Sequence, residues 1–119
     1  MDRREAPRVL FICDVEGAEV RSGTRLSNPR LSDISTTGAF VECMAPFGLG
    51  MKVNLKFTVP CLQVSVVAEV VNIRPGVGMG LEFRDLTPAQ KVAIGEVIRT
   101  SVLFGGAALA DDRELRFGT

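Results

Sequence analysis

The sequence of 119 residues contains no histidine, no tryptophan and no tyrosine. Without histidine, the chain cannot form a Ser-His-Asp or Cys-His catalytic arrangement, and it cannot bind a metal through imidazole. It also lacks an excess of either charge, since 14 basic and 14 acidic residues give a formal net charge of zero. Proteins that bind DNA, RNA or anionic membranes usually carry a clear excess of positive charge. The composition therefore argues against histidine-based catalysis and against a nucleic-acid polymer as the ligand.

Cysteines and long apolar runs are also scarce. Cys13, Cys43 and Cys61 are odd in number and widely spaced, which favours reduced thiols over a disulfide framework or a zinc site. No apolar run approaches the ~20 residues that a membrane-spanning helix needs, and no signal sequence opens the chain. The sequence predicts a cytoplasmic globular protein with no membrane insertion, metal site, cofactor or catalytic residue, and with its cysteines in the core.

The main secondary-structure signal is the alternation of apolar and polar residues, which is typical of strands with one buried face. It is clearest at residues 51–59 and recurs at 9–15, 38–44, 62–73 and 79–83, whereas residues 16–32 are polar and predict only a weak strand. Pro60-Cys61 is short enough to join two strands as a hairpin, and Pro75-Gly76 marks another turn. Six strands with no helix between them predict a small antiparallel sandwich or a closed barrel.

One helix is expected after the strands. Thr87-Pro88-Ala89-Gln90 has the order of a capping box, with proline at the first helical position. The apolar stripe behind it predicts packing against the strands, and its members are Ile94, Val97, Ile98, Ser101 and Val102. Gly105-Gly106 is the expected end, and we assign no role to the tail at 105–119.

Two clusters are not required by such a fold. The first is Arg3-Arg4-Glu5-Ala6-Pro7-Arg8, which on its own fits a solvated terminus. The chain uses 11 Arg but only 3 Lys, however, and every basic residue among the first thirty is Arg. A guanidinium binds phosphate through paired hydrogen bonds, stacks on bases, and is the commonest reader of the guanine O6 and N7 edge. Residues 1–8 are therefore a candidate flexible arm that grips a ligand.

The second cluster is Asp33-Ile34-Ser35-Thr36-Thr37-Gly38. One interpretation is a turn in which Asp33 and Ser35 bond to nearby backbone and Gly38 adopts a positive φ. The other is a recognition site: Asp33 accepts hydrogen bonds from N1 and N2 of guanine, Ser35 adds a hydroxyl contact, and Gly38 lets a ligand approach the backbone. The residues of this cluster alone leave both interpretations open.

Together the two clusters resemble the signature of the PilZ domain family, RxxxR followed by (D/N)xSxxG. Arg4-x-x-x-Arg8 and Asp33-x-Ser35-x-x-Gly38 fill every fixed position in the right order. The resemblance extends over residues 3–103, because the later segment Gly78-Met79-Gly80-Leu81-Glu82-Phe83 is similar to a late strand of the family that also precedes a helix.

The resemblance implies both a fold and a ligand. The fold is a six-stranded antiparallel β-barrel with a C-terminal α-helix, giving a domain at 1–104 with its barrel at 9–84 and its helix at 87–104. The ligand is cyclic di-GMP, a bacterial second messenger. Arg4 and Arg8 would bind phosphate and guanine, and Asp33, Ser35 and Gly38 would form the barrel side of the site. Further candidates are Arg3, Gly80 and Arg74, the last near the end of the fifth strand, where many relatives carry an aromatic residue.

The favoured function is a stand-alone receptor for cyclic di-GMP whose arm changes conformation on binding and signals to an unidentified partner protein. Arg3 favours two ligands per domain, since in the family an arginine just before RxxxR tends to accompany a ligand dimer. The alternative is a PilZ-like adaptor that binds no nucleotide, although such adaptors usually lack the motif residues. A barrel that binds nucleic acid non-specifically is disfavoured by the zero net charge and the absence of Trp and Tyr.

Overall fold

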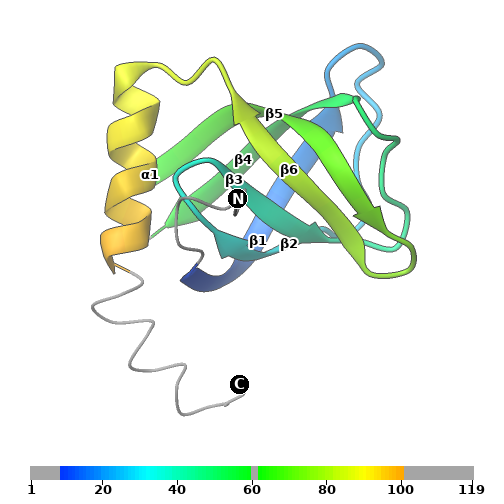
Figure 1. Cartoon of the computed structure of the whole chain (residues 1–119), viewed down its shortest axis with the longest axis horizontal. Helices are drawn as coiled ribbons and strands as arrows, with labels where there is room; N and C mark the ends of the chain where they lie inside the picture. Colours follow the sequence, from blue (N-terminus) through cyan, green and yellow to red (C-terminus); the bar gives the residue numbers. More distant parts are fainter. Residues whose placement is uncertain (1–8, 60–61, 101–119) are drawn as a thin grey trace, which may run out of the picture.

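The computed structural model of the chain describes residues 9–59 and 62–100. In chain order the elements are β1 (Val9–Glu19), β2 (Arg30–Ile34), β3 (Gly38–Glu42), β4 (Lys52–Val59), β5 (Leu62–Arg74), β6 (Gly78–Arg84) and α1 (Pro88–Thr100). All strand pairs are antiparallel, and they close into a barrel in the order β1-β2-β3-β6-β5-β4 (Figure 1). The expected six-stranded antiparallel barrel followed by a helix is confirmed, and closure decides between a barrel and a sandwich.

The alternating residues fill the inside of the barrel. In β4, Val53, Leu55 and Phe57 are at most 2% exposed, while the residues between them face solvent. Full burial of a side chain of this size contributes about 1.5–3 kcal/mol. The apolar face of each strand therefore turns inward, and every functional side chain on the wall must come from the opposite, outward set.

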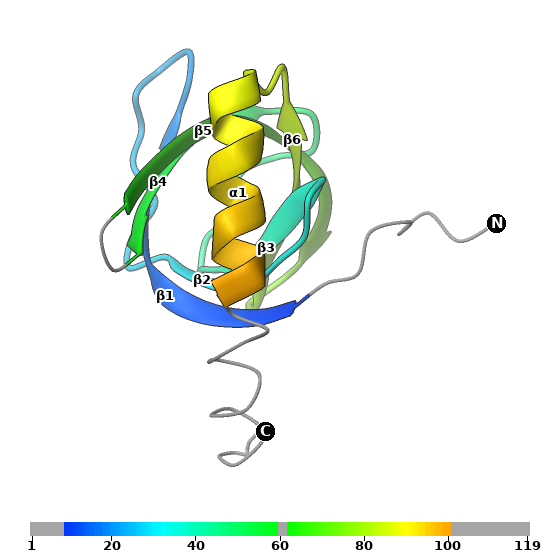
Figure 2. The ribbon, with the colours of Figure 1, turned by 90° about the vertical axis from the view of Figure 1, so that its left-hand side faces the viewer.

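The helix lies across one open end of the barrel, as Figure 2 shows. Ile94 and Val97, each 1% exposed, point at the barrel core, and Ile98 packs beside them. This confirms the apolar stripe as far as the structure describes it. The other two stripe residues and the predicted helix end at Gly105-Gly106 lie outside the described residues.

The start of α1 is fixed by the predicted capping box. The Thr87 backbone N–H donates to Gln90 Oε1 at 2.8 Å, and the Gln90 backbone N–H donates to Thr87 Oγ1 at 3.1 Å. Gln90 Nε2 also donates to the Ser65 carbonyl of β5 at 2.7 Å. The capping box thus gives hydrogen-bond partners to backbone N–H groups that the start of a helix leaves unpaired. Through Gln90 it also ties the helix to the barrel wall.

The polar stretch 16–32 is a strand only at its two ends. β1 continues through it to Glu19, β2 begins at Arg30, and a loop lies between them. Glu19 is 6% exposed and organises this loop. Its carboxylate accepts hydrogen bonds from Ser22 Oγ at 2.5 Å, from Ser22 N at 3.0 Å and from Arg21 N at 3.3 Å. These bonds, the Ser22 hydroxyl above all, lower the pKa of Glu19.

Two tight connections agree with the sequence. Val59 pairs with Leu62, as a hairpin through Pro60-Cys61 requires, although residues 60–61 themselves lie outside the described part. Between β5 and β6, Gly76 follows Pro75 with a φ of +75°, the positive value that a type II turn needs at this position.

Candidate ligand-binding site

The second sequence cluster forms the end of β2, a tight turn and the start of β3. Asp33 and Ile34 are the last residues of β2. Ser35 is 2% exposed, and its Oγ accepts hydrogen bonds from the backbone N–H groups of Thr37 and Gly38, both at 3.2 Å. The Ser35 N–H donates to the Gly38 carbonyl at 2.8 Å. The hydroxyl of Ser35 therefore holds the turn together, and its contact with a ligand stays a prediction.

Gly38 is explained by strand packing and not by an unusual backbone conformation. It is not among the glycines with positive φ, so the positive φ expected for it as part of a turn is wrong. A Cβ at this position would lie 2.2 Å from the carbonyl oxygen of Leu81 on β6. The missing side chain lets β3 and β6 approach closely, while its predicted role toward a ligand remains to be tested.

The pairing register places one row of residues across the outside of the barrel. Asp33 lies opposite Phe40 on β3, Phe40 opposite Gly80 on β6, and Gly80 opposite Asn72 on β5. Phe40 points outward, because its neighbour Val41 is 0% exposed and points inward. Directly opposed residues share a face with their Cβ atoms about 4.5–5.5 Å apart. The carboxylate, the aromatic ring and the amide therefore lie along one line.

A second row runs beside the first. Asp14 on β1 lies opposite Arg30 on β2, Arg30 opposite Glu42, Glu42 opposite Gly78, and Gly78 opposite Arg74. Arg30 thus has an acidic residue on either side of it in the ladder, whereas Arg74 is separated from Glu42 by a glycine.

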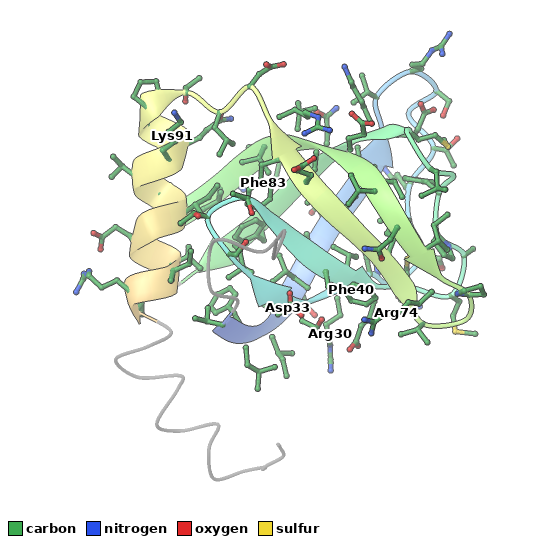
Figure 3. All side chains as sticks on the ribbon, viewed as in Figure 1. Arg30, Asp33, Phe40, Arg74, Phe83 and Lys91 are labelled. Atoms are coloured by element: carbon green, nitrogen blue, oxygen red, sulfur yellow. The ribbon has the colours of Figure 1, made fainter. Side chains whose placement is uncertain are left out.

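Five outward side chains of these rows make a mixed polar and aromatic surface, here called the outer patch, which consists of Arg30, Asp33, Phe40, Asn72 and Arg74. Figure 3 shows four of them, Arg30, Asp33, Phe40 and Arg74, on the same part of the wall, away from Lys91 on α1. The exposed carboxylates of Asp14 and Glu42 flank Arg30 in the same row. The patch combines cations, a carboxylate, an amide and a ring face, the groups that together can bind phosphates and read a base.

Phe40 and Arg74 are in direct contact within this patch. The guanidinium carbon of Arg74 lies 5.2 Å from the centroid of the Phe40 ring, which is a cation–π arrangement. A Cβ on Gly78 would lie 2.9 Å from Phe40 Cε2, and one on Gly80 would lie 2.6 Å from Asn72 Nδ2. The two glycines of β6 therefore form the floor on which the Phe40 ring and the Asn72 amide rest.

The arginine cluster, with Arg3, Arg4 and Arg8, lies outside the described residues. The first described residue, Val9, pairs with Ile34 of β2, and Leu10 lies opposite Asp33. The described chain thus begins beside the second cluster, at the residue that directly follows Arg8 in the sequence.

Three members of the outer patch escape prediction from the sequence: Arg30, Phe40 and Asn72. Phe40 alternates with the buried residues of β3, so an aromatic residue on the otherwise polar face of a strand was the available signal. Arg30 alternates with the buried Leu31, but residues 16–32 show too weak a period to predict its face. Asn72 follows from irregular register, since β5 shifts between Val70 and Asn72. Alternation in sequence does not locate such bulges.

The cysteines in the described part show no sign of reactivity. Burial, with a smaller effect from Asp14, raises the pKa of the Cys13 thiol to about 11, and burial also raises the pKa of Cys43.

Over residues 9–59 and 62–100, no group of three or more Cys, Asp or Glu side chains is placed to hold a metal ion. No helix in that part of the chain is long and apolar enough to cross a bilayer.

Comparison with known proteins relates this chain to one domain family, by sequence and by fold. A family model described as the PilZ domain matches residues 2–100, and no curated protein sequence shows a significant match. The fold resembles the Bacillus subtilis inhibitor of motility (MotI/DgrA), with a TM-score of 0.65 and 21% identity over 87% of this chain and 53% of that protein. It also resembles the PilZ domain of CeSA from a cellulose-synthesizing bacterium, with a TM-score of 0.61 and 19% identity over 83% of this chain and 96% of that domain. The chain therefore spans about half the length of the B. subtilis protein.

Proposed function

Because the chain belongs to the PilZ domain family, a family of cyclic di-GMP receptors, we propose that it binds cyclic di-GMP between its arginine cluster and the outer patch. The observation that carries this proposal is the register of β1 and β2. It brings the chain that leaves Arg8 to Ile34 and Asp33, the start of the second motif. The two motifs can then act on one ligand.

The chemistry of the ligand matches the residues gathered there. Cyclic di-GMP carries two phosphates and two guanines, so its receptor needs cations and base-reading groups side by side. Arg4 and Arg8 bind phosphate and the guanine O6 and N7 edge. The Asp33 carboxylate accepts hydrogen bonds from the guanine N1 and N2 groups. Arg3 adds a third guanidinium, which can stack on a second base or contact a second ligand.

We expect signalling to depend on residues 1–8, the arm that directly precedes β1. The ligand bridges residues 1–8 and the barrel wall, so the arm changes conformation on binding, and ordering it opposes binding by an entropic term. A partner protein then reads the altered surface. A cytoplasmic location suits a receptor for an intracellular messenger, and this function requires no catalytic group, metal or cofactor.

The experiment that tests the proposal is isothermal titration calorimetry of the whole chain with cyclic di-GMP, with GTP as the control ligand. Binding of the cyclic dinucleotide alone is expected, and a stoichiometry of two would support a ligand dimer beside Arg3. A folded protein that gives no heat and no thermal shift with cyclic di-GMP would refute the receptor function.

The alternative is an adaptor that binds a partner protein without nucleotide. Met44 and Leu49, in the loop between β3 and β4, are 79% and 66% exposed, and exposed apolar side chains of this kind fit a protein-binding surface. Absence of any binding to cyclic di-GMP would make this the better function.

A further inference from the structure

We propose that the end of the barrel opposite α1 is a peripheral docking surface for an anionic lipid bilayer. Apolar loop side chains, chiefly Met44 and Leu49, contact the headgroup region, and the cations around them bind lipid phosphates. This is contact with the surface of a bilayer, as distinct from the membrane insertion that the sequence argues against. The inference goes beyond the proposed function and does not depend on it.

The topology gathers three connections at this end. Neighbouring strands are antiparallel all round the barrel, so the connections 20–29, 43–51 and 75–77 lie together, opposite the second motif and α1 (Figure 1). The Cys43 N–H donates to the Val77 carbonyl at 3.0 Å, and the Val20 N–H donates to the Lys52 carbonyl at 2.9 Å. These three connections are here called the loop face.

The loop face carries large apolar side chains that the packing of the barrel does not require. Met44, Leu49, Val77 and Val20 are 79%, 66%, 48% and 44% exposed. Phe47 lies between Met44 and Leu49 in the sequence, yet it packs against the core. The connection thus turns its aromatic residue inward and leaves two apolar residues for contact outside the chain.

Leu49 is held at the tip of a tight turn. The Met51 N–H donates to the Gly48 carbonyl at 3.1 Å, and Gly50 has a φ of +83°, which the third residue of a type II turn needs. Leu49 is the second residue of this turn. The Gly50 N–H also donates to the Val70 carbonyl of β5 at 2.9 Å. A hydrogen-bonded backbone therefore presents this side chain to solvent.

The charge of the loop face is of one sign. Its three connections contain Arg21 and Arg25 and no acidic residue, whereas the connections 35–37, 60–61 and 85–87 at the other end contain Asp85 as their one charged residue. Within the described part of the chain, Arg25 forms no ion pair. The zero net charge of the chain thus hides an uneven distribution.

The strand residues that adjoin the loop face leave its sign positive. Arg30, Lys52 and Arg74 are exposed cations, and Glu42 is an exposed carboxylate opposite Arg30. The other acidic residue, Glu19, is 6% exposed, and its carboxylate is hydrogen-bonded within the loop. Apolar side chains with cations around them supply the two signals that peripheral binding to an anionic bilayer needs.

Two other occupants match this surface less well. A second copy related by a two-fold axis would bring the same cations together from both chains, and like charges across an interface repel. A partner protein would need a surface shaped to side chains on separate loops, whereas lipid headgroups rearrange around them. An anionic bilayer satisfies both the apolar side chains and the charge.

The absence of tryptophan and tyrosine from the chain allows a direct test. Leu49→Trp places a unique indole on the loop face, and Val92→Trp places one on α1 at the other end, where the native residue is equally exposed at 66%. With vesicles of equal parts phosphatidylglycerol and phosphatidylcholine, the emission of Leu49→Trp should shift to shorter wavelength. The emission of Val92→Trp should not move, and an equal shift in both proteins would contradict the proposal.

Cosedimentation of the full chain with the same vesicles measures affinity. The parent should bind them at low salt, should release them as salt rises, and should not bind pure phosphatidylcholine. Leu49→Ser should weaken binding by about 10-fold or more through lost apolar transfer, with Val92→Ser as the matched control. Arg25→Gln should weaken it by about 5-fold, with Lys91→Gln on α1 unchanged. Urea unfolding of each variant should match the parent.

Three further results would overturn the proposal. A folded parent that does not bind the anionic vesicles at low salt would leave a partner protein as the occupant of the loop face. Parent-like vesicle binding by both Leu49→Ser and Arg25→Gln would show that the loop face is not used. A parent that sediments as a dimer and becomes monomeric with Leu49→Ser would assign the face to a second copy.

The inference and the proposed function fail separately. Leu49→Ser should bind cyclic di-GMP like the parent in calorimetry, because Leu49 belongs to neither motif and lies outside the outer patch. A parent that binds vesicles but not cyclic di-GMP would refute the receptor function alone. A parent that binds cyclic di-GMP but not vesicles would refute the docking surface alone.

Discussion

Gly38 and Leu81 approach so closely across the β3–β6 pair that a Cβ on Gly38 would lie 2.2 Å from the Leu81 carbonyl oxygen. The oxygen belongs to the backbone of β6, which is paired with a strand on either side, so it cannot move aside as the end of a flexible side chain would. The glycine of the second motif is thus a requirement of the barrel, whatever it also does toward a ligand.

Gly38→Ala should therefore destabilise the protein, by about 1–3 kcal/mol or more as forced overpacking does. The matched change Gly95→Ala in α1 should act in the opposite direction, because nothing beyond the adjoining helix backbone lies within 4 Å of the added methyl group. Alanine is favoured over glycine in a helix by about 0.8–1 kcal/mol. Urea unfolding of both variants measures whether each change lowers or raises the free energy of unfolding. An unfolding free energy of Gly38→Ala equal to that of the parent would contradict the steric explanation.

Arg4→Ala and Arg8→Ala should each weaken binding of cyclic di-GMP by roughly 10- to 100-fold, the effect of losing a charged hydrogen bond of about 1.5–3 kcal/mol. Their melting temperatures should equal that of the parent, because both residues precede the first strand of the barrel. Arg25→Ala, in the loop before β2, serves as the control with unchanged affinity. Parent-like affinity in both arm variants would rule out the proposed role of the arm.

Asp33→Ala should reduce both affinity and base selectivity. The parent should prefer cyclic di-GMP over cyclic di-IMP, which lacks the N2 amino group, and the variant should lose this preference because the acceptor is gone. Asp14→Ala on β1 removes a nearby carboxylate that lies in the other row and should leave the preference intact. If Asp33→Ala unfolds the domain while Asp14→Ala does not, Asp33 serves the strand end and not the guanine edge.

Glu19→Gln should lower the melting temperature at neutral pH and should matter less in acid. The pKa of Glu19 lies below its ordinary value of 4.5 in the folded protein, so its charge contributes stability that is fully present above that value. The contribution is lost as the pH falls through the lower folded pKa. Melting curves of parent and variant should therefore converge below pH 4.5. A difference that stays constant across the titration would show that the charge of Glu19 has no part in holding the loop.

Cys13 and Cys43 should react slowly with a thiol reagent in the folded protein. The raised pKa values leave little thiolate at mildly alkaline pH, and burial limits access. A Cys61→Ser background isolates these two thiols, since the chain has three cysteines. Labelling should become fast in denaturant, and fast labelling without denaturant would mean that these residues are not core residues.

The sequence predicts the strands best where every second residue is apolar, as in β4, because one period then decides the whole element. It fails between β1 and β2, because the loop there is held by hydrogen bonds to the buried carboxylate of Glu19, the last residue of β1, and not by an apolar alternation. It cannot choose between sandwich and barrel either, because closure depends on the pairing of β1 with β4, residues far apart along the chain.

The candidate site shows the same division. Asp33 is found from a linear motif, whereas Phe40 and Arg74 belong to different strands and become neighbours only through β6. Arg74 follows from the resemblance only as a candidate near the end of the fifth strand. The structure shows an exposed side chain that rests on an aromatic ring, a pair that no spacing within one segment encodes.

The glycine floor also constrains how such a protein can evolve. A side chain at Gly78 would meet the Val41 carbonyl at 2.2 Å, so a mutation there that blocks the outer patch also damages the barrel. A lineage that keeps this fold must therefore keep a residue without a side chain at position 78, whatever the outer patch binds. Proteins with this barrel should therefore carry these glycines for packing, whether or not they bind a nucleotide.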